Sequence, residues 1–275
     1  MNHGIRIFLA SLMALSAQYI ADIAGFMVTA LFAHGVSDYL KSFIVAITNI
    51  VIVAILFRCC ALRWFRLKPS MAELTINIHG MVLALLLCLS LFAAIFLISL
   101  FWVDEYIVAN FERIGLILFN SFINRGISTA IGEELLFRGF LFSYLLSITK
   151  PINAFVISIM VFVLPHMLVF QPDLTALFIL INYISVSLLL TALYYKTKSI
   201  STSIVFHALY NFILYGIWNV GSTGESDSSI FTSIMSNTES DGIILFSAVC
   251  LILMSCFIFK SNKNWQVCAA IELTD

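Results

Sequence analysis

Charged residues are scarce in this chain. Only 11% of its 275 residues are Asp, Glu, Lys or Arg, whereas 61% are hydrophobic and the mean hydropathy is +1.05. Soluble domains carry about 25% charged and 45–50% apolar residues. The shortage of charge therefore excludes an ordinary soluble domain and predicts a polytopic membrane protein. With a net charge of -1, the sequence gives no reason to expect a nucleic-acid partner.

Residues that mark linkers and crosslinks are also few. The chain has four Pro and 12 Gly, and no repeat, low-complexity tract or separate soluble region is visible. A single integral membrane domain over residues 1–275 is therefore expected. None of the six cysteines shows CxxC spacing, and most lie in or beside apolar runs. They are interpreted as small buried hydrophobic residues rather than disulfides or metal ligands.

Long apolar runs are what the sequence does contain. A helix needs about 20 apolar residues to cross a bilayer. The runs predict an all-α fold, a membrane helical bundle with about eight transmembrane helices. The first run is too long for the apolar part of a signal peptide, so a retained helix is expected. Gln18 and Asp22, four apart in that run, are interpreted as partners in hydrogen bonds between helices. The eight runs are Ile5–Phe32, Phe43–Phe57, Gly80–Val103, Ile127–Leu146, Ile152–Phe170, Leu174–Tyr195, Ile200–Val220 and Ile243–Phe259.

The segment 106–124 decides the expected orientation. It carries Glu112 and Arg113 in its middle, and it is expected to lie in the membrane interface without crossing. Cytoplasmic loops carry an excess of Lys and Arg, which then places both termini in the cytoplasm and the polar stretch 221–241 outside. The predicted location is an integral, multi-pass protein of the plasma (inner) membrane if the source is bacterial. A crossing by 106–124 would instead move five lysines outside: Lys150, Lys196, Lys198, Lys260 and Lys263.

Three ionisable side chains interrupt the apolar run that ends at Leu146: Glu133, Glu134 and Arg138. A charge at membrane depth costs roughly 2.5–3.5 kcal/mol on insertion scales, so such residues are rare and usually functional. Glu134 and Arg138 are four apart and can pair on one helix face. Glu133 points about 100° away. This division predicts a structural Glu134 beside a catalytic Glu133.

Later spans carry further polar groups: His166, Asn182, and the pair His207 and Asn211, which is four apart. Polar groups left unpaired in hydrocarbon are expensive, so they are expected to face one another or a hydrated cavity. A structural polar cluster that joins helices is the alternative. The expected span boundaries place Glu133 and His166 near the outer ends of their helices and His207 nearer an inner end. That mismatch is roughly 10 Å.

This set of side chains suits amide hydrolysis. A carboxylate without a paired cation can take a proton from water, and a His can assist as a second base or protonate the leaving amine. A second His and an Asn amide can hydrogen-bond an oxyanion. No Ser or Cys nucleophile stands beside a base, so water is the expected nucleophile. Zinc held by Glu133, His166 and His207 is the alternative activator, although no HExxH signature is present; no other cofactor is expected.

Three motifs in order resemble the CPBP family, the CAAX proteases and bacteriocin-processing enzymes also called Abi proteins, and in particular the type II CAAX prenyl endopeptidase. The resemblance covers roughly residues 114–218, which are expected to form the catalytic core. The motifs are Glu133-Glu134-Leu135-Leu136-Phe137-Arg138, Phe162-Val163-Leu164-Pro165-His166 and His207-Ala208-Leu209-Tyr210-Asn211.

The resemblance implies an intramembrane endopeptidase acting on a lipidated or hydrophobic peptide or protein among membrane lipids. It implies that Glu133 activates water with help from His166, and that His207 and Asn211 form the oxyanion site. Glu134 and Arg138 then support the site, and a glutamate-type mechanism without metal is expected. The alternatives are a non-catalytic membrane regulator or bacteriocin-immunity protein of the same fold, and a small transporter with a proton-relay carboxylate. The sequence lacks the paired broken helices that would support a transporter.

Overall fold

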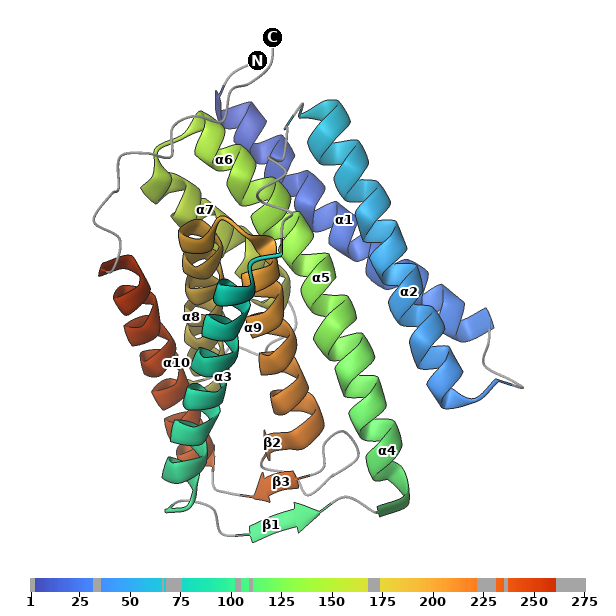
Figure 1. The fold of residues 1–275 in the computed structure, drawn as a ribbon, viewed down its shortest axis with the longest axis vertical. Coiled ribbons are helices and arrows are strands. Elements are labelled where there is room, and N and C mark those ends of the chain that lie inside the picture. The colour runs from blue at the N-terminus through green and yellow to red at the C-terminus, as the bar shows by residue number, and fades with distance from the viewer. Residues whose placement is uncertain are drawn as a thin grey trace.

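The computed structural model describes residues 3–31, 36–65, 67, 76–101, 105–108, 111–167, 174–221, 231–234 and 237–260. These residues form a helical bundle with a small sheet at one end (Figure 1). The α-helices are α1 (His3–Leu31), α2 (Asp38–Phe57), α3 (Ile78–Ser99), α4 (Phe111–Asn120), α5 (Thr129–Glu134), α6 (Ser143–Ile148), α7 (Pro151–Met167), α8 (Leu174–Thr197), α9 (Ile200–Phe212) and α10 (Asn237–Lys260). Four π-helical stretches extend them: η1 (Arg58–Trp64), η2 (Ser121–Ser128), η3 (Leu135–Phe142) and η4 (Ile213–Ile217).

Helix length and apolarity confirm the predicted helical membrane bundle. Within the described residues, seven helices are long and apolar enough to cross a membrane. The remaining predicted span, Ile152–Phe170, corresponds to α7, a shorter apolar helix of 17 residues. At 1.5 Å per residue, α7 is roughly 25 Å long, slightly less than a hydrocarbon core of about 30 Å.

A continuous helix runs through the middle of the molecule and changes one expectation. Helices α4, η2, α5, η3 and α6 follow one another without a break, and 114–148 forms a single stretch of 35 residues (Figure 1). The segment 106–124 was expected to lie separately in the interface; instead its second half is the first part of this helix. The apolar residues of α4 continue the helical pattern of the next span, so no turn separates the two.

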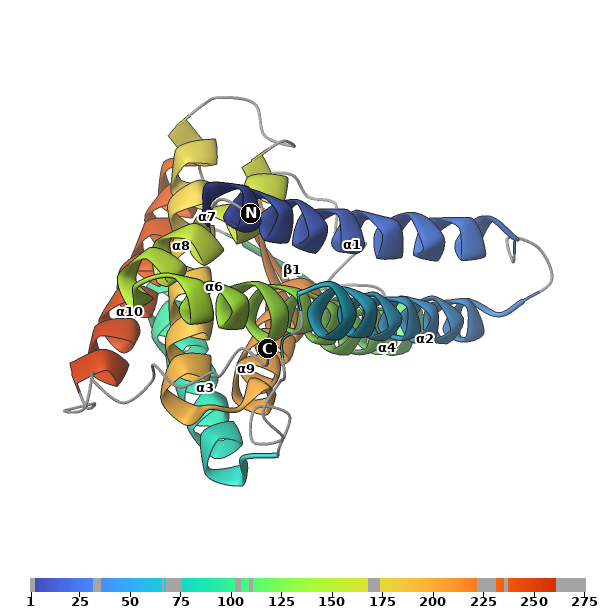
Figure 2. The same cartoon turned by 90° about the horizontal axis from the view of Figure 1, so that it is seen from above.

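The bundle has two packed groups of helices. Small side chains allow α1 to approach its neighbours closely, since Ala10, Ala14, Ala17 and Ala21 are all at most 2% exposed. Viewed from above, α1 and α2 project together to one side of the other helices (Figure 2). The second group comprises α3, α8, α9 and α10, whose apolar faces share a separate core.

A three-stranded sheet closes the end of the bundle away from the termini (Figure 1). Its strands are β1 (Glu105–Val108), β2 (Trp218–Gly221) and β3 (Phe231–Ile234). The central strand β3 pairs antiparallel with β1 and parallel with β2. The sequence analysis did not predict these strands. The sheet joins the chain before α4 to the chain after η4, and so connects the helix that carries Glu133 to the helix that carries His207.

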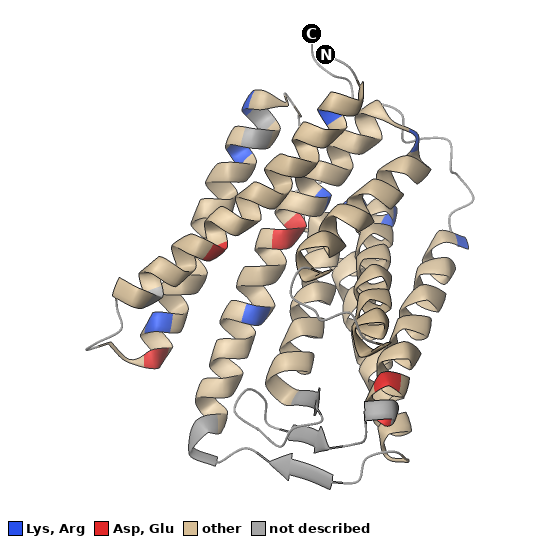
Figure 3. Ribbon diagram, turned by 180° about the vertical axis from the view of Figure 1, so that it is seen from behind, with Lys and Arg blue, Asp and Glu red and all other residues tan. Residues whose placement is uncertain are grey.

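Charge and cysteine distribution agree with a membrane bundle. Lys and Arg gather toward the end at which the termini lie, and the helices are otherwise almost without charge (Figure 3). Four cysteines within the described part of the chain are free, as expected, but only Cys88 is buried; Cys250 is half-buried, and Cys59 and Cys256 are exposed, so the expected burial is wrong for these two. The side chain of Cys60, all of Cys268 and most of the polar stretch 221–241 lie outside the described residues.

Candidate active site

Helix α5 places two neighbouring glutamates in different surroundings. The α-helical segment is only six residues long and lies between the π-helical stretches η2 and η3. π-Helical turns are rare and occur often at functional sites. Glu134 is fully buried, whereas the side chain of Glu133 keeps 12% of its surface exposed toward a cavity. The backbone therefore gives one carboxylate an enclosed position and the other an accessible one.

Glu134 accepts two charge-assisted hydrogen bonds through a single oxygen. Its Oε1 lies 2.9 Å from Nη1 of Arg138 and 2.8 Å from Nδ1 of His207. The structure therefore contains the expected Glu134–Arg138 ion pair, one helical turn apart. It adds a contact that the sequence analysis did not predict, because His207 comes from α9. Glu134 thus connects the buried cation to an imidazole from another helix.

Arg138 is completely buried and has partners on two sides. Its Nη2 donates to the hydroxyl of Ser187 at 3.0 Å and to the Ser187 carbonyl at 3.2 Å. Its guanidinium carbon lies 4.5 Å from the centre of the Phe162 ring. A buried charge is tolerated when its hydrogen bonds and counter-charge are supplied together. Ser187 and Phe162 therefore hold Arg138 where it fixes Glu134.

His207 lies between the two glutamates. While Nδ1 bonds Glu134, Nε2 is 3.8 Å from Oε2 of Glu133. Because Glu134 is paired with Arg138, its carboxylate acts as the acceptor and His207 Nδ1 as the donor. The Nε2 atom is left on the side of Glu133 and of the cavity. The imidazole is only 5% exposed, so its orientation is set by these neighbours.

A cavity of about 460 Å³ brings the sequence motifs together. Glu133, His166, His207 and Asn211 all line it, although they come from α5, α7 and α9. The apolar part of its wall comes from α3, α8, α9, η4 and α10: Phe92, Ile95, Ile179, Val186, Tyr210, Leu214, Ile243 and Ile244. The cavity therefore combines acid, base and amide groups with an apolar lining.

His166 enters this cavity from the last turn of α7. Its Nδ1 lies 3.1 Å from the Phe162 carbonyl, and its ring centre lies 4.2 Å from that of Tyr183. A carbonyl oxygen accepts, so Nδ1 carries the proton in the neutral ring and Nε2 remains available as a proton acceptor. The helix continues through Pro165 and ends two residues later, at Met167.

Asn211 joins α9 to the helix that carries Glu133. Its side-chain nitrogen donates to the Arg125 carbonyl at 2.9 Å while the residue also lines the cavity. One amide hydrogen is thus engaged, and the second remains for a ligand. Asn182 is similarly placed, since it accepts from the Tyr210 hydroxyl at 3.0 Å and donates to the Ile244 carbonyl at 3.3 Å. Both amides hold helices together at the cavity wall.

The expected depth mismatch is absent from the structure. Glu133 and His207 were expected to lie roughly 10 Å apart along the membrane normal, but their side chains lie 3.8 Å apart. The expected helix boundaries were wrong for both residues. The helix that carries Glu133 starts earlier, within 106–124, which moves Glu133 toward its middle. The span 200–217 ends earlier than expected, so His207 is also near the middle of its own helix.

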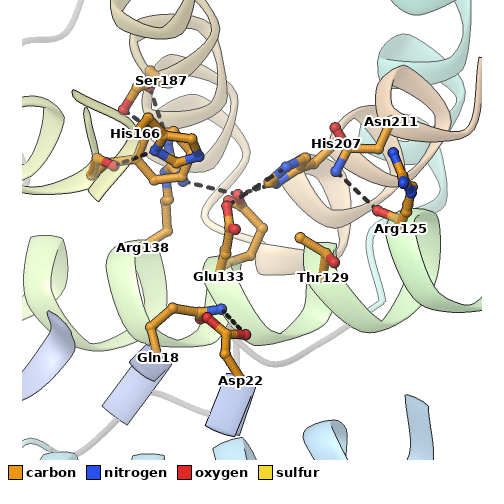
Figure 4. A network of polar contacts seen from close by, with 12 residues as sticks. Gln18, Asp22, Arg125, Thr129, Glu133, Arg138, His166, Ser187, His207 and Asn211 are labelled. Carbon is orange, nitrogen blue, oxygen red and sulfur yellow. Dashed lines mark hydrogen bonds and ion pairs between the residues drawn. The ribbon is translucent and has the colours of Figure 1, made fainter. Parts of the chain in front are cut away.

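Among the cavity residues that the sequence analysis missed, two polar ones lie on the helix of Glu133. Arg125 and Thr129 line the same wall as Glu133, and the three residues follow one another at intervals of four. Figure 4 shows them on the side of the helix that faces His207 and Asn211. The spacing was a visible signal, but 106–124 was treated as a separate segment and Arg125 as a residue of the following loop.

The Gln18–Asp22 pair lies on the other side of that helix (Figure 4). Gln18 donates to Asp22 at 3.2 Å within α1, and neither residue lines the cavity. The hydrogen bond between them joins two turns of one helix, whereas bonds between helices were expected.

A zinc ion could be bound only if the side chains of Glu133, His166 and His207 lay close enough together to coordinate one ion. Among the described residues, no three His, Cys, Asp or Glu side chains form a group that would hold a metal ion. The side chains as placed do not fit that ligand set.

Fold and site together define a class: a polytopic helical membrane protein with paired glutamates, two histidines and an amide around an enclosed cavity. Residues 114–213 match the family model described as type II CAAX prenyl endopeptidase Rce1-like. The matched segment contains all three motifs that resemble this family. A search among curated proteins gives no match to the chain.

Proposed function

We propose that this protein is an intramembrane endopeptidase that hydrolyses a peptide bond by a water molecule activated by Glu133. The observation that carries the proposal is the position of Glu133. Its carboxylate faces the cavity, 3.8 Å from His207 Nε2, while the adjacent Glu134 is bonded to Arg138 and His207. One carboxylate is therefore accessible to water and substrate, and it lies inside the Rce1-like domain.

The first step is addition of water to the substrate carbonyl. Glu133 takes a proton from water, and the hydroxide adds to the carbonyl carbon, which leaves a negative charge on the carbonyl oxygen. His166, which lines the same cavity and has Nε2 available, assists this transfer. Burial of the reacting groups strengthens each electrostatic contact because little water competes with it.

The oxyanion is then held by donors from α9. The second amide hydrogen of Asn211 is one donor, and Nε2 of His207 is the other. Since Nδ1 of His207 already donates to Glu134, donation from Nε2 requires the doubly protonated imidazolium. Glu134 is thus a positioning residue that keeps the second nitrogen directed toward the cavity.

Collapse of the tetrahedral intermediate completes the reaction. The carbonyl re-forms, the C–N bond breaks, and the proton held by Glu133 passes to the leaving nitrogen. The products are a carboxylic acid and an amine, and Glu133 returns to its starting state. Each proton that leaves water is therefore accounted for by residues of this chain.

The substrate we propose is a peptide with a lipid or other hydrophobic group beside the scissile bond. Apolar residues from α3, α8 and α10 line the same cavity as Glu133, so a hydrocarbon substituent on the substrate has a place near the reacting carbonyl. Both termini are proposed to be cytoplasmic, and 114–218 is proposed as the catalytic core of a single membrane domain.

The test compares peptides released by membranes that contain wild-type protein or the Glu133→Gln variant. Wild type should release fragments that the variant does not, while both proteins fold and insert equally. Equal release by both proteins would overturn the proposed mechanism. If a cellular phenotype is fully supported by both Glu133→Gln and His207→Ala variants, the protein acts as a regulator rather than a protease.

A further inference from the structure

His166 has little support from its own helix. It lies in the last turn of α7, one residue before the helix ends at Met167. Its side chain is half-buried, and within the described part of the chain its ring makes one hydrogen bond, from Nδ1 to the Phe162 carbonyl. The χ2 torsion of a histidine has broad minima, so packing has to fix the direction of its second nitrogen.

The closest packing against His166 comes from another helix. The centre of the Tyr183 ring of α8 lies 4.2 Å from the imidazole centre, with 37° between the two planes. The Phe162 ring, one turn earlier on α7, lies 5.3 Å away. Centres of packed aromatic rings are ordinarily about 4.5–7 Å apart, so the Tyr183 contact is tight. Because Phe162 belongs to α7 itself, Tyr183 is the ring that relates the imidazole to the rest of the bundle.

Tyr183 is in turn connected to the helix of the two glutamates. Its hydroxyl is hydrogen-bonded to that of Tyr215 in η4. The Tyr215 ring lies under the Arg125 guanidinium, 4.8 Å from the guanidinium carbon, and the Tyr215 carbonyl accepts from the Ser121 hydroxyl at 3.3 Å. Arg125 and Ser121 both belong to η2, which leads directly into α5. A series of contacts therefore runs from the imidazole on α7 to the segment before the glutamates.

The backbone beside Tyr183 is also fixed. The preceding residue, Asn182, donates to the Ile244 carbonyl of α10 at 3.3 Å and accepts from the Tyr210 hydroxyl of α9 at 3.0 Å. The Tyr183 ring thus projects into the cavity from a part of α8 that two other helices hold. Catalytic groups need such support, because a small loss of alignment lowers the rate.

We propose that Tyr183 is a positioning residue for His166. Its ring holds the imidazole so that Nε2 stays directed at the water activated by Glu133. Its hydroxyl, through Tyr215, keeps α7 aligned with the helix that carries Glu133. Tyr183 itself transfers no proton. The inference rests on the proposed function, because it assigns a support to the residue that assists Glu133 in that reaction.

The kinetic experiment is a double-substitution cycle in the full-length protein. Tyr183→Leu removes the ring, and Tyr183→Phe keeps the ring without the hydroxyl. Each is made with His166 in place and with His166→Gln. Phe92→Leu is the matched control, since Phe92 lines the same cavity but packs on Tyr210. Cleavage of a peptide with an S-farnesyl cysteine followed by three apolar residues gives kcat and KM for each variant.

Tyr183→Leu should lower kcat about three- to tenfold, the size expected for the loss of one aromatic contact, and should leave KM within about twofold. In the His166→Gln background it should have no further effect on kcat. Tyr183→Phe should restore most of kcat. Phe92→Leu should act chiefly on KM, and equally in both backgrounds. An equal loss of kcat from Tyr183→Leu in both backgrounds, or no loss in either, would overturn the inference.

The imidazole can also be observed without cleavage. In protein with isotope-labelled histidine, the nitrogen shifts of His166 should report a single tautomer protonated at Nδ1, in wild type and in Tyr183→Phe. Tyr183→Leu should give a mixture of tautomers, while the His207 signals stay unchanged. Should Tyr183→Leu not fold, Tyr183→Met fills a similar volume without a ring and takes its place.

The two measurements separate this inference from the proposed function. A single Nδ1-protonated tautomer that survives removal of the Tyr183 ring would overturn the inference, even if Glu133→Gln abolishes cleavage as proposed. A tautomer that depends on Tyr183, in a protein whose cleavage is the same with Glu133→Gln, would reject the proposed function while Tyr183 remains the residue that orients His166.

Discussion

Nδ1 of His207 lies 2.8 Å from Oε1 of Glu134, in a hydrogen bond that joins α9 to α5. This contact gives the second glutamate of the motif a role distinct from that of the first. Glu134 holds an imidazole in place, and Glu133 faces the cavity. Substituting these residues and their neighbours one at a time distinguishes their roles in catalysis from their contributions to folding.

Glu133→Gln should lose at least about 10³-fold in kcat, since an amide cannot take a proton from water. Its thermal unfolding in detergent should match that of wild type, because the side chain is only partly enclosed. Asp38→Asn is the matched control, as it removes one exposed carboxylate from the Lys41 pair. It should leave activity unchanged. Loss of folding in Glu133→Gln would mean that the residue is structural.

Glu134→Ala should be more destabilising than any change at Glu133. It leaves Arg138 buried without its counter-charge, which costs about 3–5 kcal/mol when one partner of a buried pair is removed. Glu134→Gln keeps an acceptor for His207, so it should be more stable than Glu134→Ala. Its kcat should recover by a smaller fraction than its stability. Thermal unfolding and single-turnover cleavage measure the two effects separately. Wild-type stability in both variants would contradict the central role of the charge.

Ser187→Ala tests the support of Arg138 from α8. The hydroxyl bond at 3.0 Å is lost while the carbonyl contact at 3.2 Å remains. The expected loss of unfolding free energy is about 1–3 kcal/mol, the cost of leaving part of a buried donor unsatisfied. Ser16→Ala serves as the control, because its hydroxyl bonds only its own helix at an exposed position. A neutral Ser187→Ala would show that the carbonyl alone suffices.

Gly80→Ala should destabilise the packing of α3 against α9. A Cβ at this position would overlap the hydroxyl oxygen of Thr202, and the Asn77 side chain that caps α3 lies beside it. Overpacking of this kind costs roughly 1–3 kcal/mol. Gly4→Ala has nothing within 4 Å of the new Cβ and should be neutral or slightly stabilising. Double substitution of Gly80 and Thr202 to Ala should recover part of the loss.

Removal of metal should leave cleavage intact under the proposed mechanism. The purified protein should contain less than one equivalent of zinc by elemental analysis, and chelator should not lower kcat. The zinc alternative predicts the reverse, with chelator inhibition reversed by added zinc. His166→Gln should then abolish zinc binding in that alternative, but reduce only the rate in the glutamate mechanism.

The fold was largely predictable because hydrocarbon length imposes a strong constraint on sequence. Apolar runs such as 78–99 and 174–197 appear as helices close to their expected bounds. The segment 106–124 was not predictable in the same way, since Glu112 and Arg113 suggest an interface while its apolar face continues a helix. The strands were missed because each has only four residues and their pairing joins distant parts of the chain.

For the site, sequence spacing predicted contacts within one helix and missed contacts between helices. Glu134 and Arg138 pair as an i,i+4 relationship requires. The bond from His207 to Glu134 spans 73 positions, and that from Arg138 to Ser187 spans 49, so no local period reveals them. The residue roles assigned to Glu133, His166, His207 and Asn211 remain predictions, which the variants above test.

The small sheet has a consequence for how a substrate gains entry. β1 precedes α4 and β2 follows η4, and both pair with β3. Main-chain hydrogen bonds therefore hold the helices of Glu133 and His207 together at one end, and the Glu134–His207 bond joins them near their middle. Spreading these two helices would break both connections at once. A bulky substrate is thus expected to enter sideways from the bilayer, past helices that take part in neither connection, such as α7.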